Sequence, residues 1–95
     1  MAVSYNGQTK SEYFKNFKRI KDMVSLYPND KEMQIKLAKK QSKLITDESK
    51  AINRAMIAKE LGYEYIFDVF FNRAYQLGAV GKQQYREYQL SKLGV

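Results

Sequence analysis

The chain has 95 residues, with 17 lysine and arginine residues against 10 aspartate and glutamate residues, and a formal net charge of +7. It contains neither histidine nor cysteine, which excludes zinc fingers, Cys/His nucleophile pairs and disulfide bonds. Hydrophobic residues make up 44% of the chain, enough for one packed core. We therefore expect one small domain that binds or supports other molecules, is not an enzyme, and carries no cofactor or metal.

The cellular compartment can be inferred only from the absence of targeting and membrane-spanning segments in the sequence. No stretch of about 18 consecutive apolar residues is present, and the first ten residues resemble no secretory leader. We expect a soluble protein without membrane association, with the cytoplasm as the default compartment. Lysine outnumbers arginine 13 to 4, a bias typical of an AT-rich genome such as that of a low-GC bacterium or its phage.

Helix-breaking residues divide the chain into four helical segments that follow a flexible tail over residues 1–9. In the first segment, from about residue 10 to 27, apolar residues recur at steps of three and four, the spacing of one helix face. Pro28 forces the preceding residue out of the helical region, and Asn29 or Asp30 can cap the next helix. The apolar face is formed by Tyr13, Phe17, Ile20, Val24 and Tyr27.

The second segment runs from about residue 31 to 61, and Gly62 is expected to end it in the left-handed conformation. Within it, Thr46-Asp47-Glu48 resembles an N-cap followed by first-turn acids. The segment is therefore either one continuous helix or two helices with a break at this point.

The third segment, about 64–77, is apolar around most of its circumference and is expected to be the core helix or an oligomer seam. A last short helix covers about 82–93, after a turn with glycines at cap positions. These elements predict an all-α, compact bundle of four or five helices in a single domain over residues 10–95. The expected core packs Phe67, Phe70, Phe71 and Tyr75 against Phe17, Ile20, Val24, Leu44, Ile52 and Met56.

A helix-turn-helix-like hairpin is predicted around Gly62. Residues 54–63, Arg-Ala-Met-Ile-Ala-Lys-Glu-Leu-Gly-Tyr, resemble the first helix and turn of many helix-turn-helix proteins. From this stretch to Gly78, the spacing of the Ile-Ala pair, the Gly-Tyr pair and the later glycine resembles that of the second helix-turn-helix of AraC-family regulators. This resemblance implies a second helix that reads DNA. The sequence departs from that family in length and in its paired phenylalanines, which do not fall on Val69 and Arg73.

Electrostatics weigh against base reading by this second helix. Glu64 and Asp68 would face the phosphates of a duplex, and their repulsion favours a helix hairpin of structural function. The residues of this helix suited to base edges are Asn72, Arg73 and Gln76.

The positive charge is concentrated early in the chain, because residues 10–43 hold ten basic and four acidic residues. Helical spacing gathers seven of these cations into two stripes, each away from the apolar face of its helix. Such stripes form either a solvated surface or a surface that contacts nucleic-acid phosphates without reading bases. The stripes consist of Lys15, Lys18 and Arg19 on the first helix and Lys36, Lys39, Lys40 and Lys43 on the second.

The sequence thus predicts a small non-catalytic DNA-binding protein, a regulator or accessory factor that acts as a homodimer. Its stripes would contact the phosphates of duplex DNA, and Asn72 and Arg73 would complete the nucleic-acid site. The alternative is a protein-interaction part, such as a phage-encoded inhibitor of a host factor or a virion or assembly component. It would bind an acidic partner through Tyr63, Tyr65 and Phe67.

Overall fold

The computed structural model describes residues 8–94 and confirms the predicted all-α fold. Five helices, and no strand, make up this part of the chain. They are α1 (Lys10–Leu26), α2 (Lys31–Leu44), α3 (Glu48–Glu60), α4 (Glu64–Leu77) and α5 (Lys82–Lys92). Residues 1–7 of the predicted tail lie outside the described residues. The last two tail residues belong to the fold, because Gln8 is buried and Thr9 caps α1.

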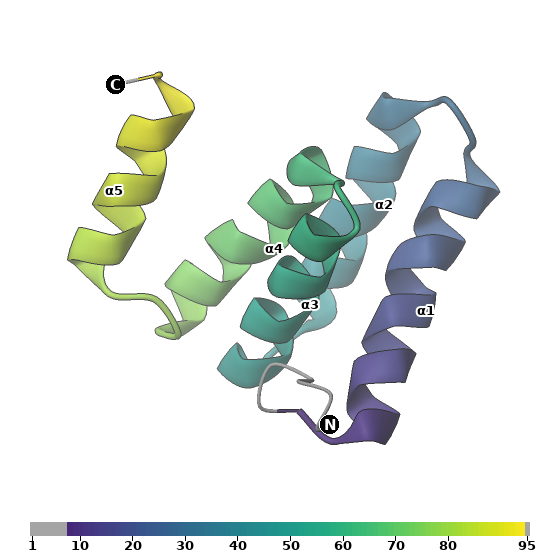
Figure 1. Ribbon diagram of the computed structural model, residues 1–95, viewed down its shortest axis with the longest axis horizontal. Coiled ribbons are helices and arrows are strands. Elements are labelled where there is room, and N and C mark those ends of the chain that lie inside the picture. The colour runs from purple at the N-terminus through teal and green to yellow at the C-terminus, as the bar shows by residue number, and fades with distance from the viewer. Residues whose placement is uncertain (1–7, 95) are drawn as a thin grey trace, which may run out of the picture.

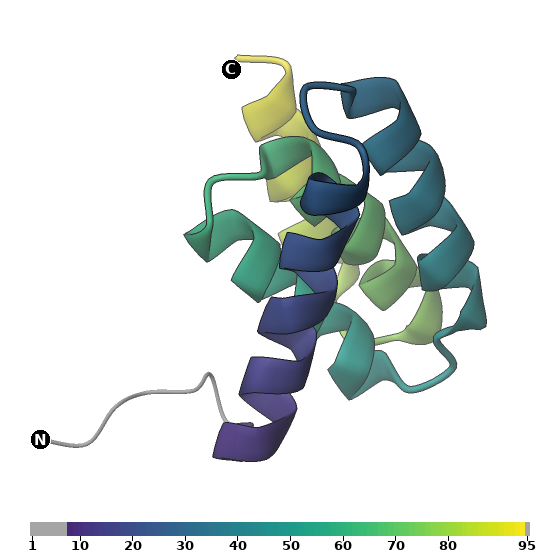
Figure 2. The ribbon, with the colours of Figure 1, turned by 90° about the vertical axis from the view of Figure 1, so that its right-hand side faces the viewer.

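Helices α1 to α4 form a ring of four, and α5 lies outside it beside α4 (Figure 1). The most extensive packing is between α3 and α4. Helix α4 also packs on α2, and α1 closes the ring against α2 and α3. Figure 2 looks onto α1, with α2 beside it. The four helices therefore share one core, as the amount of apolar side chain predicts.

Local capping explains where the helices begin and end. Thr9, Asp30 and Asp47 each accept a hydrogen bond from a first-turn backbone N–H, at 3.2, 3.1 and 2.9 Å, which satisfies a donor that has no partner inside the helix. Gly62 and Gly78 end α3 and α4 with φ of 86° and 94°, values that glycine adopts without steric cost. The helix ends predicted from capping residues and glycines are confirmed. They could be predicted because the interactions that produce them are short-range.

The segment from 31 to 61 is two helices, so its alternative as one continuous rod is wrong. Helix α2 ends at Leu44, and the linker to α3 buries Ile45, which is 6% exposed. Arg73 on α4 donates two hydrogen bonds to the Ile45 carbonyl, from Nε at 3.1 Å and from Nη2 at 2.8 Å. The break is therefore held by a helix that is distant in the sequence.

Burial confirms most of the predicted core and corrects it at Leu44. That side chain is 78% exposed, because the chain leaves the helix there and Ile45 turns into the core instead. Tyr27, expected on the apolar face of α1, is 36% exposed at the corner after that helix. Alanines of α2, α3 and α4 are fully buried in this core, and the largest fully buried side chains are Phe70, Ile20, Met23, Ile57 and Ile66.

Aromatic side chains attach α5 to α4. Tyr85 stacks on Tyr75 with ring centroids 3.9 Å apart, and Tyr88 packs against Phe67 and Phe71 at 5.9 and 4.6 Å. The ring contacts therefore connect α5 to α4, which are drawn as neighbouring ribbons in Figure 1. With α5 in place, Glu64 and Gln76 are the only exposed residues of α4, so α4 is the core helix and its apolar breadth is covered within the chain.

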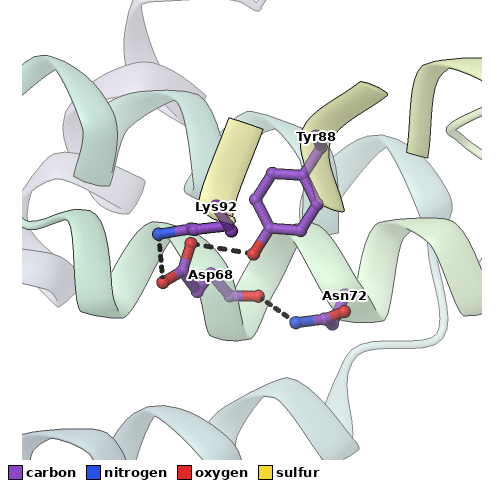
Figure 3. Close-up of polar contacts among 4 residues, drawn as sticks. All are labelled: Asp68, Asn72, Tyr88 and Lys92. Atoms are coloured by element: carbon purple, nitrogen blue, oxygen red, sulfur yellow. Dashed lines mark hydrogen bonds and ion pairs between the residues drawn. The ribbon is translucent and has the colours of Figure 1, made fainter. Parts of the chain in front are cut away.

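A carboxylate on α4 completes this attachment. Asp68 accepts a hydrogen bond from the Tyr88 hydroxyl at 2.8 Å and pairs with Lys92 Nζ at 2.7 Å (Figure 3). The two oxygens of Asp68 thus each have a partner on α5, as the dashed lines show. The negative charge of Asp68 is therefore compensated by the last helix.

Candidate nucleic-acid interface

The α2 stripe presents four lysines to solvent on the side of the helix opposite the core. The side chains of Lys36, Lys39, Lys40 and Lys43 are all exposed, and none forms an ion pair with a carboxylate of residues 8–94. Buried Ala38 lies on the opposite, core-facing side of the helix. The helix therefore has the amphipathic character that its lysine spacing predicts, with the ammonium groups free to meet an external anion.

Two of these lysines line a hollow between α2 and α4. Lys39 and Lys43 form its rim together with Asp68 and Arg73, and apolar Val69 lies among its lining residues. The volume is about 430 Å³, and its positive residues outnumber its single carboxylate. An anionic chain that contacted the α2 stripe would pass the edge of this hollow.

The α1 cations are exposed but face a different part of the molecule. Lys15 and Arg19 line a pocket between α1 and the beginning of α3, whereas Lys18 lines neither this pocket nor the hollow at α2. Gln41 and Leu44 of α2 line an adjoining pocket with Arg19. Lys15 and Arg19 of the α1 stripe thus line other pockets than Lys39 and Lys43 of the α2 stripe.

Two basic residues outside the predicted stripes also line the pocket beside α1, namely Lys50 and Arg54. They stand four residues apart on α3, and Lys15 and Arg19 stand four residues apart on α1. Such spacing places each pair on one helix face. The repeated spacing was a signal in the sequence, but only the packing of α1 on α3 brings the two pairs together.

Arg54 is the most unusual charged group in the described part of the chain. Its side chain is buried, at 8% exposed, and its Nε donates a hydrogen bond to Asn16 Oδ1 at 3.0 Å. Burial, and secondarily the positive charge of Arg19, lower the pKa of Arg54 below the ordinary arginine value. No carboxylate within residues 8–94 forms an ion pair with it.

The two residues predicted to meet bases are engaged inside the fold. Asn72 Nδ2 donates to the Asp68 carbonyl at 2.7 Å (Figure 3), and its Oδ1 accepts a hydrogen bond from the Tyr85 hydroxyl. Arg73 donates to the linker carbonyl of Ile45 and, through Nη1, to Gln76 Oε1 at 3.2 Å. Both side chains hold neighbouring segments onto α4, and base contacts would require these hydrogen bonds to break.

The aromatic residues predicted to bind a protein partner are mostly covered. Phe67 is buried at 6% exposed, against α5. Tyr65 is half-buried and donates its hydroxyl hydrogen bond to Gln34 Oε1, and its pKa is raised by burial and by neighbouring Tyr63. A partner at this turn would contact the exposed parts of the two tyrosines and not Phe67.

Comparisons with protein-family models, with curated proteins and with solved structures find no match to this chain. Within residues 8–94, none of the helices is long and apolar enough to cross a membrane. The same stretch contains no cluster of acidic side chains that could hold a metal ion. Function must therefore be argued from the charge and geometry described above.

Proposed function

We propose that this protein is a small non-catalytic DNA-binding protein that contacts duplex phosphates through the basic surfaces of α1 and α2. The observation that carries the proposal is the α2 stripe: four exposed lysines on one helix face without a carboxylate partner in residues 8–94. Such a row releases counterions from a duplex and binds it independently of sequence. The net charge of +7 adds long-range attraction.

The contacts proposed are to the DNA backbone, because α4 offers few groups to bases. Only Glu64 and Gln76 of this helix are exposed, and Asn72 and Arg73 hold other parts of the fold. The homodimer expected from the sequence belongs to the proposal, since two copies would double the number of phosphate contacts. The mass of the protein in solution, measured free and with duplex, tests that part.

A salt-dependent titration with labelled duplex DNA tests the proposal. In a variant with Lys36, Lys39, Lys40 and Lys43 all changed to Gln, we expect weaker binding and a log–log salt slope reduced by about one for each lysine. The slope matters more than the affinity at one salt concentration, because it counts the phosphates that are contacted.

A second quadruple variant controls for the loss of net charge. Lys10, Lys21, Lys82 and Arg86 are exposed and lie outside both basic surfaces, so their change to Gln removes the same charge elsewhere. This control should keep most of the salt slope. Equal effects of the two variants, or no duplex binding at low salt, would contradict the proposal.

A further inference from the structure

The pocket between α1 and α3 has the composition of an anion-binding site. Two adjoining cavities, of about 190 and 350 Å³, share Arg19, Asp47, Lys50 and Arg54 among their lining residues. Side-chain amides line the remaining walls with Leu44, Ile45, Thr46 and Ser49. The charged groups of both cavities are Lys15, Arg19, Lys50 and Arg54 against Glu12 and Asp47.

Arg54 brings to this pocket a positive charge that has no carboxylate partner within residues 8–94. Arg54 is 8% exposed as a residue, and burying much of a charged side chain is costly unless a counter-charge or several acceptors compensate for its lost hydration. Within residues 8–94 its one hydrogen-bond acceptor is Asn16 Oδ1, on Nε, and no carboxylate pairs with it. Arg19 adds repulsion, since its charge disfavours the protonated form of Arg54.

The guanidinium is also held in position. Asn16 is buried and donates from Nδ2 to Gln8 Oε1 at 2.8 Å, so a chain of amides fixes the oxygen that receives Arg54 Nε. The guanidinium carbon lies 6.0 Å from the centre of the Phe70 ring. With Nε fixed by Asn16, the remaining N–H donors belong to the terminal nitrogens, which form no hydrogen bond within the described residues.

The first turn of α3 adds to the positive potential at the same place. Ser49 and Lys50 line the pocket, and the amino end of a helix carries a partial positive charge that favours anions. Asp47 satisfies the backbone N–H of Ser49 at 2.9 Å. Neither Asp47 nor Glu12 forms an ion pair with the basic residues of the pocket.

We propose that this pocket binds a single phosphate group, with the guanidinium groups of Arg54 and Arg19 as its main ligands and Lys50 and Lys15 as outer cations. Cations on two helices can surround the several oxygens of a phosphate, and guanidinium groups bind it through paired N–H donors. The pocket shares Lys15 and Arg19 with the α1 surface of the proposed function. The two proposals can still fail separately, because the α2 lysines line a different cavity and inorganic phosphate alone is the probe.

The experiment is an NMR titration of the full chain with inorganic phosphate, replacing chloride at constant ionic strength. We expect saturable binding at one site, with the largest shifts in the amides around Asn16, Lys50 and Arg54. Asn16→Asp would place a carboxylate beside Arg54 Nε and should weaken phosphate binding by about tenfold or more, since it supplies the missing counter-charge. Lys50→Gln, at an exposed position, should weaken it by several-fold without disturbing the core.

Lys21→Gln is the matched control, because Lys21 is exposed on α1 and lines neither pocket. Phosphate affinity in this variant should stay within about twofold of the wild type. The absence of saturable binding by the wild type would overturn the proposal. Unchanged affinity in both Asn16→Asp and Lys50→Gln, or equal weakening by Lys21→Gln, would also overturn it. If Asn16→Asp does not fold, the proposal is judged by whether Lys50→Gln weakens phosphate binding more than Lys21→Gln does.

A competition experiment then identifies the source of the phosphate. A duplex is added to the phosphate-saturated protein, once with 5′-phosphate ends and once with 5′-hydroxyl ends. Displacement of inorganic phosphate by either duplex supports a pocket that seats a nucleic-acid phosphate. Retention of phosphate beside both duplexes supports a pocket for free phosphate or a small phosphorylated molecule.

Discussion

The α4/α5 contact and the α1/α3 pocket both place a charged side chain against aromatic rings between helices, but the chain satisfies only one of them. On α4, Asp68 has a hydroxyl partner and an ammonium partner from α5. On α3, buried Arg54 has a single amide acceptor in the described residues. A charge that the fold compensates is part of the architecture. A charge that the fold holds in place without a carboxylate partner is available to an anion from outside.

The largest loss of stability among the substitutions that test this comparison of Arg54 with Asp68 is expected at Asn16. Asn16→Ala removes the acceptor of Arg54 Nε and should lower the free energy of unfolding by about 3 kcal/mol, because a buried charged donor is left without a partner. Urea denaturation measures it. In an Arg54→Met background the same change should cost much less, since the buried charge is gone. An equal cost in both backgrounds would show that Asn16 stabilises the fold independently of Arg54.

A smaller effect is expected at Asp68. The side chains of Asp68 and Lys92 are 30% and 41% exposed, so their ion pair contributes little, and most of the loss comes from the Tyr88 hydrogen bond. Asp68→Ala should lower the free energy of unfolding by about 1.5 kcal/mol. Asp68→Asn keeps an acceptor oxygen and should lose less. If Asp68→Ala lowered the free energy of unfolding more than Asn16→Ala does, the expected order of the two regions would be wrong.

The smallest expected effect on stability is that of Tyr88, and it appears only in alkaline solution. Burial raises the pKa of Tyr88, and its hydrogen bond to Asp68 raises it further. Because the pKa of Tyr88 is higher in the folded protein than in the unfolded chain, the protonated hydroxyl stabilises the fold. This stabilisation is complete below the pKa of the unfolded chain, about 10 for tyrosine. It is lost as the pH rises from that value through the pKa of the folded protein. Tyr88→Phe should therefore show a shallower fall in the urea midpoint above about pH 10. Identical pH profiles for the variant and the wild type would contradict this assignment.

Helix boundaries were predictable because their causes are local. Pro28 and Asp30 define the first corner, and Gly62 and Gly78 end α3 and α4, as the observed dihedral angles show. The lysine stripes were predictable for the same reason, since the rotation of a helix places residues three and four apart on one face. At the α2–α3 linker the local signals were balanced, and the hydrogen bonds from Arg73 on α4 hold the break.

The candidate site shows where this kind of prediction ends. By side-chain type, Asn72 and Arg73 were predicted to contact bases, yet among their partners are Tyr85 and Ile45, which lie 13 and 28 positions away along the chain. Leu44 was predicted to lie in the core, although the chain turns so that the next residue is buried instead. Residue type states what a side chain can bind, and packing decides whether it is still available.

By itself, the sequence determined an all-α fold, its caps and turns, and the excess of positive charge on the first two helices. Those features depend on periodicity and on neighbours within one helical turn. The tertiary structure alone decided that Arg19 and Arg54 line the same pocket, and that Asp68 pairs with Lys92. These outcomes depend on which helix faces come into contact, and contacts between residues 24 to 35 positions apart leave no periodic signal in the chain.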